Sequence, residues 1–180
     1  MNYLILVNKN NGLTKSYKPS NLVKVKSPIN KDIYLENKTY ISALNMLEDY
    51  NSKSDNIKLI IDSGYRSYDY QSILNKKEPS KVGVTLASPG FSEHQTGLAI
   101  DIGFIKDGLY DPYYDIDEYK KEFKWLQDNS YKYGFILRYP LGKENITGYS
   151  YEPWHFRYIG NLANYLYNKN ITLEEFFNVK

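Results

Sequence analysis

Short runs of apolar residues, one of them with clear alternation of apolar and polar positions, predict β-strands at five places in the chain. Alternation is typical of a half-buried strand, and a short continuous apolar run is typical of a fully buried one. Residues 154–159 show the alternation, with Trp154, Phe156 and Tyr158 on one side. The five predicted strands cover residues 3–7, 57–61, 97–104, 135–139 and 154–159.

Apolar residues at helical spacing, together with residues that favour helix ends, predict five helices. Asn37 is the expected N-cap of the first helix and Ser67 that of the second. Asp115, with Glu118 three positions later, resembles a capping box at the start of the third helix, which ends at Gly134. The later helices cover residues 67–76, 115–134 and 161–167, and a last one begins at residue 172.

Strands and helices follow one another in a mixed order. This order favours an α+β fold with a mainly antiparallel central sheet flanked by helices over a doubly wound parallel sheet. A length of 180 residues fits one domain with a sizeable core, so we expect a single domain over residues 1–180. Residues 8–37 are rich in Asn, Lys, Ser and Pro, so we expect residues 1–37 to form an N-terminal arm packed on that domain.

Composition excludes several classes of function. The chain has no cysteine, which rules out a disulfide framework, a thiolate metal site and a thiol nucleophile. Its net charge of +2 is interspersed, without a long basic run, so we expect no nucleic-acid partner. No stretch approaches the roughly 20 apolar residues of a membrane span, and the opening MNYLILVNKNNG lacks the parts of a signal peptide. We therefore expect no transmembrane segment and a cytoplasmic location.

An aspartate interrupts the apolar run of the third predicted strand. Asp101 lies between Ile100 and Ile102, where a buried unpaired carboxylate would be costly or would change its pKa. The chain has two histidines, His94 ahead of this strand and His155 in a later one. Two imidazoles and one carboxylate can form a catalytic zinc site with the fourth position left for water. One Zn²⁺ per chain would also compensate the charge of Asp101.

A structural interpretation stays open beside this functional one. A single histidine is more often an ordinary core or surface residue than a ligand, although here both histidines lie in segments that also carry carboxylates. Glu152 precedes Pro153, which favours an extended backbone, so its carboxylate could reach a metal-bound water as general base. The alternative for Glu152 is a surface residue in a salt bridge, and spacing alone does not separate the two.

Two more residues near the predicted site allow two interpretations. Arg66 lies in the turn SGYRS between a predicted strand and a predicted helix, and it could stabilise the oxyanion that develops during amide hydrolysis. A cation at a helix start is mildly unfavourable, which favours this role over that of a surface arginine. Trp154 is adjacent to His155, and core packing is the favoured interpretation over a substrate contact.

Two motifs carry a resemblance to a known family. The pattern S-x-H-x-x-G-x-A-x-D over residues 92–101 and E-x-W-H over residues 152–155 resemble the signature of the VanY-type zinc D,D-peptidases, whose fold is shared with hedgehog signalling domains. The segments LVNKNN, YGFILRYP and ITGYSYEPWHFRYIG make the chain similar to the VanXY branch, the D,D-dipeptidases/D,D-carboxypeptidases linked to vancomycin resistance. The resemblance covers most of the chain.

The resemblance implies a role for each motif residue. It implies that His94, Asp101 and His155 hold zinc, that Glu152 is the catalytic base, and that Arg66 polarises the scissile carbonyl. The residues implied or expected to contact substrate are Gln71, Ser92 and Trp154. Residues 74–86 and 105–117 are the segments expected to form the walls of the site.

The function implied is hydrolysis of D-alanyl-D-alanine, as the dipeptide, at the C-terminus of a peptidoglycan precursor, or both. The partner would then be a peptide that ends in D-alanine. An L,D-carboxypeptidase or a peptidoglycan endopeptidase of the same fold is the alternative among enzymes. A binding protein in which zinc only stabilises the fold is the alternative from another class, and a three-ligand set argues against it, because structural sites usually have a fourth protein ligand.

Overall fold

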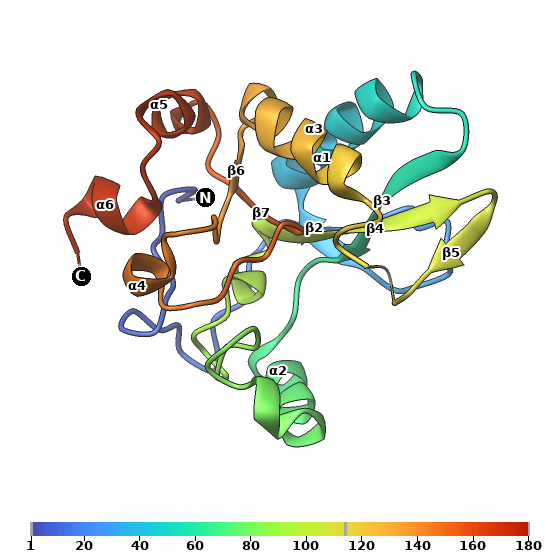
Figure 1. Ribbon diagram of the computed structural model, residues 1–180. Helices are drawn as coiled ribbons and strands as arrows, with labels where there is room; N and C mark the ends of the chain where they lie inside the picture. Colours follow the sequence, from blue (N-terminus) through green and yellow to red (C-terminus); the bar gives the residue numbers. More distant parts are fainter. Residues whose placement is uncertain (1, 114, 180) are drawn as a thin grey trace.

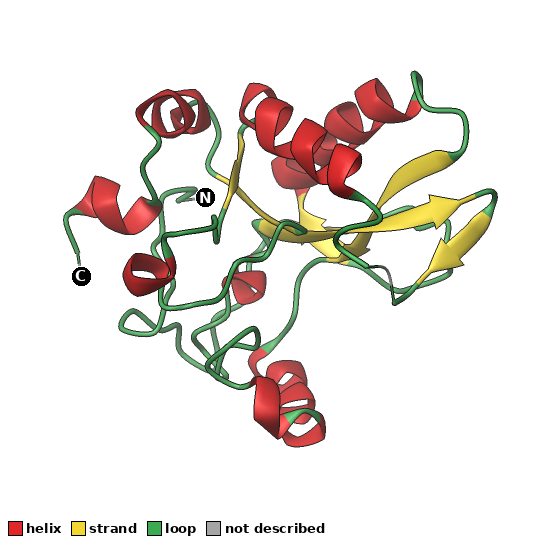
Figure 2. Ribbon diagram, in the orientation of Figure 1, coloured by secondary structure: helices red, strands yellow, loops and turns green. Residues whose placement is uncertain are grey.

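A five-stranded antiparallel sheet forms the centre of the molecule (Figures 1 and 2). The structure is a computed structural model that describes residues 2–113 and 115–179. The strands are β1 (Leu22–Lys24), β2 (Tyr34–Glu36), β3 (Ile57–Ser63), β4 (Ala99–Lys106), β5 (Leu109–Asp111), β6 (Phe135–Leu137) and β7 (His155–Tyr158). The helices are α1 (Asn37–Asn51), α2 (Tyr68–Lys77), α3 (Lys120–Asn129), α4 (Glu144–Thr147), α5 (Leu162–Lys169) and α6 (Leu173–Phe177). Short 3₁₀ helices cover Pro79–Lys81, Glu93–Thr96 and Ser130–Tyr133.

The long strand β4 organises the sheet. It pairs with β3 along one edge, and along the other edge with β7 at its start and with β5 at its end. The order is β3-β4-β7-β6, and every pairing is antiparallel. The predicted α+β class with a mainly antiparallel central sheet is confirmed.

The two faces of the sheet differ in character because side chains alternate along β4. Ile100, Ile102 and Phe104 belong to the main hydrophobic core, together with residues of α1 and α3. These two helices lie on one face of the sheet (Figure 1), whereas α2 lies on the other side. Asp101 alternates with the core residues and therefore points toward the side of α2 and the loops.

The first predicted strand is wrong. Residues 3–7 form no strand, because their backbone groups are used elsewhere: the guanidinium of Arg157 donates to the carbonyl oxygens of Tyr3 and Ile5 at 3.0 and 2.8 Å. The strands β1, β2 and β5 were not predicted. Each has three residues, too few for a period to be recognised in the sequence.

Two predicted helix starts are corrected. Glu36, not Asn37, is the N-cap of α1, and its carboxylate accepts a hydrogen bond from the backbone N–H of Thr39 at 2.9 Å. Asp115 caps a turn by accepting from the N–H of Asp117, and α3 begins only at Lys120. The helix start predicted at Asp115 is therefore wrong, because an aspartate side chain stabilises a short turn as readily as a helix start. The predicted cap Ser67 is present. The helix expected from residue 172 is α6, and Thr172 with Glu175 forms a capping box at its start.

The remaining predicted strands lie within one or two residues of those observed at most ends. The run 57–61 extends to Ser63, with a register shift between Ile61 and Ser63. The third predicted strand begins later than expected, because Gly97 adopts the left-handed conformation with φ 70° and ends the 3₁₀ helix instead. No helix of the described part of the chain is both long and apolar enough to cross a bilayer.

The packing of β3 and β5 generates the first prediction. Leu59 on β3 is 1% exposed and Leu109 on β5 is 76% exposed, although both strands pair with β4. We expect Leu59→Ala to lower the free energy of unfolding by about 2–5 kcal/mol, because it leaves a cavity in the core. The matched change Leu109→Ala should stay within about 0.5 kcal/mol of the parent protein. Urea denaturation checks both, and equal losses would contradict this assignment of the core.

Candidate metal centre and active site

Strand register places two of the predicted ligands opposite each other. Asp101 on β4 is the direct partner of His155 on β7 in the antiparallel ladder. Side chains of such a pair lie on the same face of the sheet within contact distance. The Nδ1 atom of His155 lies 3.1 Å from Oδ1 of Asp101. The backbone pairing therefore sets this part of the site, although 54 positions separate the two residues in the chain.

The third predicted ligand comes from the 3₁₀ helix that precedes β4. The Nδ1 of His94 lies 2.6 Å from the carbonyl oxygen of Gly64, so this nitrogen carries the proton. Its Nε2 points at the site, 3.2 Å from Oδ2 of Asp101. This Nε2 is buried and has no hydrogen-bond partner. A neutral imidazole with its free nitrogen aimed at a carboxylate fits a metal ligand, because the backbone carbonyl fixes the tautomer.

Together the three side chains form a cluster suited to a divalent metal. Their candidate ligand atoms, from His94, Asp101 and His155, all lie within 4.8 Å of one another. Two nitrogen donors and one carboxylate oxygen are a donor set that zinc accepts, and three protein donors leave a position for water. The buried nitrogen of His94 without a partner is the observation that makes the fit specific.

Electrostatics at the cluster is dominated by burial and by Asp101. Burial, helped by the charge of Arg66, lowers the pKa of His94 to about 4, so this ring is neutral at pH 7 as ligation requires. Burial also lowers the pKa of His155, but its interactions with Asp101 and Glu93 outweigh this and raise the pKa to about 9. Burial opposes ionisation of Asp101, yet His94 and His155 hold the pKa of this carboxyl well below its usual range. A bound cation would favour the same ionised Asp101.

Glu152 lies beside the cluster and not on the surface. It is 3% exposed, and its Oε2 lies 3.6 Å from Nδ1 of His155. Its backbone N–H donates to the carbonyl oxygen of Tyr139, which holds the residue at the cavity wall. Burial is the main reason that the pKa of Glu152 is raised to about 7. The surface salt bridge considered from the sequence is therefore not what the structure has.

Arg66 reaches the cluster from the junction of β3 and α2. Its backbone N–H donates to the carbonyl oxygen of His94, and its Nη2 lies 3.9 Å from Oδ2 of Asp101. Its Nε is buried without a hydrogen-bond partner. An unsatisfied cationic N–H group at the edge of the cavity is available to an oxygen of a bound molecule.

The three predicted substrate contacts have different positions. Ser92 and Trp154 line the cavity. Trp154 also packs against the main core, as its favoured interpretation expects, and its contact with substrate stays a prediction. Gln71 does not line the cavity. It is 1% exposed, and its Nε2 donates to the carbonyl oxygen of Ala87 at 2.8 Å. Gln71, the buried residue of α2, thus holds the wall residue Ala87 in place from behind.

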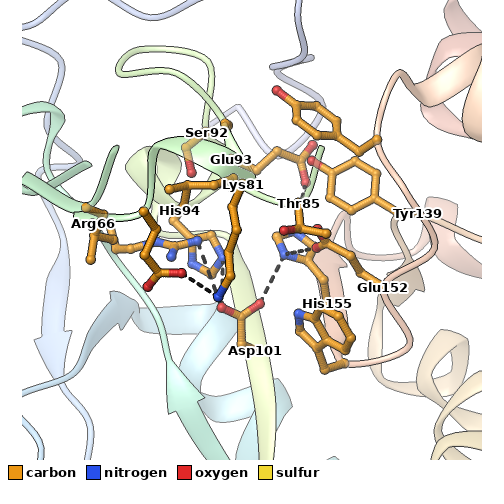
Figure 3. Close-up of a pocket in the computed structure, with 16 residues that line it drawn as sticks. Arg66, Lys81, Thr85, Ser92, Glu93, His94, Asp101, Tyr139, Glu152 and His155 are labelled. Atoms are coloured by element: carbon orange, nitrogen blue, oxygen red, sulfur yellow. Dashed lines mark hydrogen bonds and ion pairs between the residues drawn. The ribbon is translucent and has the colours of Figure 1, made fainter. Parts of the chain in front are cut away.

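Figure 3 shows the cavity, of about 250 Å³, around these side chains. One predicted wall, residues 74–86, is present and contributes the side chains of Leu74, Glu78, Lys81, Thr85 and Leu86. The second predicted wall, residues 105–117, is wrong for the part of it that the structure describes. This segment contains the end of β4 and the short strand β5, on the opposite end of the sheet from the site. Tyr114, within it, lies outside the described residues.

The sequence interpretation missed a buried network of charges behind His155. Glu93 accepts hydrogen bonds from Arg138 and Arg157, at 2.7 and 2.8 Å, and Glu174 binds Arg138 in turn. A signal in the sequence was available: the chain has only three arginines among 23 basic residues, and these are Arg66, Arg138 and Arg157. Arginine is preferred over lysine for buried, multiply bonded ion pairs, so a chain that otherwise uses lysine marks these positions.

A mixed fold that assembles a His, Asp and His cluster beside a buried glutamate defines a candidate metallopeptidase. The chain belongs to the VanY family, because the family model described as "VanY: D-alanyl-D-alanine carboxypeptidase" matches residues 32–161. The similarity to VanY and VanXY proteins expected from the motifs is thereby confirmed. The chain is a peptidase of this carboxypeptidase family.

Three relatives show the extent of the similarity. "Putative carboxypeptidase YodJ" of Bacillus subtilis is 42% identical, over 98% of this chain and 67% of its own length. A D-alanyl-D-alanine carboxypeptidase of Enterococcus faecium is 43% identical over 65% of this chain and 35% of its own length. The bifunctional D-Ala-D-Ala dipeptidase and carboxypeptidase VanXYC of Enterococcus gallinarum is 39% identical, over 89% of this chain and 85% of its own. The chain thus spans about two thirds of YodJ and about a third of the Enterococcus faecium enzyme.

Solved structures are similar over nearly the whole chain. The LdcB LD-carboxypeptidase is 39% identical with a TM-score of 0.84, over 99% of this chain and 87% of that one. A VanY D,D-pentapeptidase variant from a VanB-type resistance cassette, in complex with Zn(II), is 31% identical with a TM-score of 0.79, over 99% and 100%. VanYB in complex with D-alanine-D-alanine is 31% identical with a TM-score of 0.78, over 99% and 98%. The fold is therefore shared by peptidases described as cutting different bonds.

The donor geometry generates the second prediction. We expect the protein to bind one Zn²⁺ per chain, and Asp101→Asn to weaken binding because a neutral amide replaces the one anionic donor. The loss should exceed the roughly 10- to 100-fold that follows removal of a residue that only supports a ligand. Isothermal titration calorimetry measures the affinity, with Asp55→Asn, at an exposed aspartate, as the matched control. Unchanged zinc affinity in Asp101→Asn would remove Asp101 from the ligand set.

Proposed function

We propose that this protein is a zinc-dependent D,D-peptidase that releases D-alanine from peptides ending in D-alanyl-D-alanine. The single observation that carries the proposal is the buried Glu152 carboxylate beside the cluster of His94, Asp101 and His155. A metal centre with three protein donors needs a base next to it for hydrolysis, and this chain has one there. Membership of the VanY family and the similarity to VanYB bound to D-alanine-D-alanine support the substrate.

Zinc bound to the three donors would polarise the scissile carbonyl and make water a stronger nucleophile. Glu152 would accept the proton of the attacking water and return it to the nitrogen of the leaving D-alanine. Its pKa, raised by burial to about 7, suits a group that must both accept and donate a proton near neutral pH. The charge of Arg66, whose Nε has no protein partner, would stabilise the negative charge that develops on the carbonyl oxygen.

The three-donor cluster also bears on the alternative of a binding protein that uses zinc only to stabilise its fold. Within the described residues, the candidate metal cluster contains three side chains and no fourth. A structural site would use a fourth protein ligand, whereas a catalytic site keeps that position open. The cluster faces a cavity lined by sixteen residues, including Ser92 and Trp154, and is open to a small molecule.

An L,D-carboxypeptidase is the second candidate function. The observation that favours it is the similarity to LdcB, which extends over 99% of this chain at a TM-score of 0.84. The two candidates share the proposed metal centre and base. They differ in the residue that precedes the scissile bond, so the substrate and not the mechanism distinguishes them.

The substrate experiment measures D-alanine released by the zinc-loaded protein. The substrates are D-alanyl-D-alanine, UDP-MurNAc-pentapeptide and the tetrapeptide that ends in an L,D bond. We expect release from the dipeptide, the pentapeptide or both, and no release after treatment with a chelator. Release from the tetrapeptide alone would assign the L,D activity instead, and no release from any substrate by zinc-loaded protein would contradict both candidates.

Glu152→Ala tests the proposed mechanism in the same assay. We expect kcat to fall by at least about 10²- to 10⁴-fold, the usual contribution of a general base. Zinc should still bind, because Glu152 is outside the ligand set, and calorimetry of the variant checks this. Glu48→Ala, an exposed position on α1, is the matched control and should keep full activity. Full hydrolysis by zinc-loaded Glu152→Ala would mean that another group transfers the proton.

A role in glycopeptide resistance is a further part of the proposal. It is supported by the similarity to the VanY variant from a VanB-type resistance cassette and to VanXYC. Expression of the protein in a vancomycin-susceptible strain should raise the inhibitory concentration of vancomycin, and Glu152→Ala should abolish the rise. The cytoplasmic location expected from the sequence also stays a proposal, and recovery of the native protein from outside the cell membrane would contradict it.

A further inference from the structure

The buried face of His155, opposite the cluster, is occupied by the carboxylate of Glu93. Oε2 of Glu93 lies 3.6 Å from Nε2 of His155, and both atoms are buried without a hydrogen-bond partner. Glu93 is 1% exposed and His155 is 4% exposed, so no bulk water reaches this contact. Buried polar atoms without a hydrogen-bond partner are rare, so two of them that face each other call for an explanation.

The chemistry of imidazole determines which ring nitrogen of His155 carries the proton when the other one binds a metal. Nδ1 of His155 is the nitrogen that faces Asp101, at 3.1 Å, and it is therefore the nitrogen available to a metal. A neutral imidazole that ligates through Nδ1 carries its single proton on Nε2. The carboxylate of Glu93 is then in position to accept that proton as a hydrogen bond.

Glu93 is itself fixed by two arginines. Its other oxygen, Oε1, accepts from Nε of Arg138 at 2.7 Å and from Nη1 of Arg157 at 2.8 Å. These contacts occupy Oε1 and leave Oε2 free for His155. All of these charged side chains are essentially buried. A carboxylate between two guanidinium groups remains ionised and has little freedom to rotate.

The network continues to the C-terminal helix and the N-terminal segment. Glu174 on α6 binds Arg138 through two parallel hydrogen bonds, of 2.9 and 2.6 Å. Asn8 donates to the same Glu174 at 3.1 Å, and Arg157 donates to the carbonyl oxygen of Ile5. Both end regions of the chain are thereby connected through hydrogen bonds to Glu93, which faces His155.

We propose that Glu93 is a positioning residue for the metal centre: its Oε2 accepts the Nε2 proton of His155 and thereby directs Nδ1 to the metal. Glu174 contributes indirectly to the position of His155, because it holds Arg138 against Glu93. The inference rests on the proposed metal centre and names a determinant of its affinity. Residues that orient ligands in this way typically contribute about 10- to 100-fold to metal affinity.

The variant Glu93→Gln tests the inference. Its amide preserves size, but the group that faces Nε2 of His155 becomes a donor or a weaker acceptor. We expect zinc affinity, measured by competition with a chromophoric chelator, to fall about 10- to 100-fold. Glu174→Gln keeps a hydrogen-bonding oxygen beside Arg138 and should cause a smaller loss. Glu48→Gln, an exposed change of the same kind on α1, should match the parent protein.

A spectroscopic measurement on the unmodified protein tests the inference without a variant. The chain has only two histidines, so long-range proton–nitrogen NMR spectra of the zinc-loaded protein contain four imidazole nitrogens to assign. We expect the proton of His155 on Nε2 and that of His94 on Nδ1. The two tautomers give different correlation patterns, and the Nε2 proton of His155 should exchange slowly with solvent.

The outcomes separate this inference from the proposed function. Failure of the unmodified protein to bind zinc would contradict the proposed metal centre. Zinc binding by the unmodified protein, combined with equal affinity in folded Glu93→Gln, would overturn the positioning role alone. If Glu93→Gln does not fold, the tautomer of His155 decides: a proton on Nδ1, with Nε2 on the metal, would also overturn the inference.

Discussion

A carboxylate near the start of the central strand β4 is the constraint on which the rest of the structure depends. Asp101 lies on β4, with β3 on one side and β7 on the other, and its neighbours Ile100 and Ile102 are fully buried. Burial of an uncompensated carboxylate is strongly unfavourable. The fold compensates it with groups from three segments: His94 in the 3₁₀ helix before β4, His155 on β7, and Arg66 in the loop after β3.

Side chains alternate along β4, so the residues of the hydrophobic core and the metal-ligand candidate lie on opposite faces of the sheet. The side chains of Ile100, Ile102 and Phe104 belong to the hydrophobic core with residues of α1 and α3, whereas Asp101, which alternates with them, lines the cavity. Asp101 can therefore lie on a strand that is paired on both sides without lying in the core. The ligands from β4 and β7 gain the rigidity of a paired strand, which is the precision that a metal centre requires.

A second set of buried charges lies beside His155, and in this set too each charge is compensated by one of opposite sign. Glu93 and Glu174 alternate with Arg138 and Arg157 so that each charge contacts one of opposite sign. Buried ion pairs add little net stability, but loss of one partner typically costs about 3–5 kcal/mol, because a buried charge is left without compensation. The network therefore determines geometry more than overall stability, and the residue that it positions is His155.

The sequence by itself determined the pieces that depend on local pattern. Apolar periodicity identified β3, β4, β6 and β7, and the spacing of His94, Asp101 and His155 with Glu152 identified the candidate site. Only the tertiary structure decided the partners. It placed Gln71 behind the wall, turned Asp115 into a turn residue, removed the strand expected at residues 3–7 and joined Glu93 to Glu174 through Arg138. The physical reason is that periodicity reports which face of an element is apolar, whereas a buried polar group is satisfied by residues distant in the chain, and those become known only when the chain is folded.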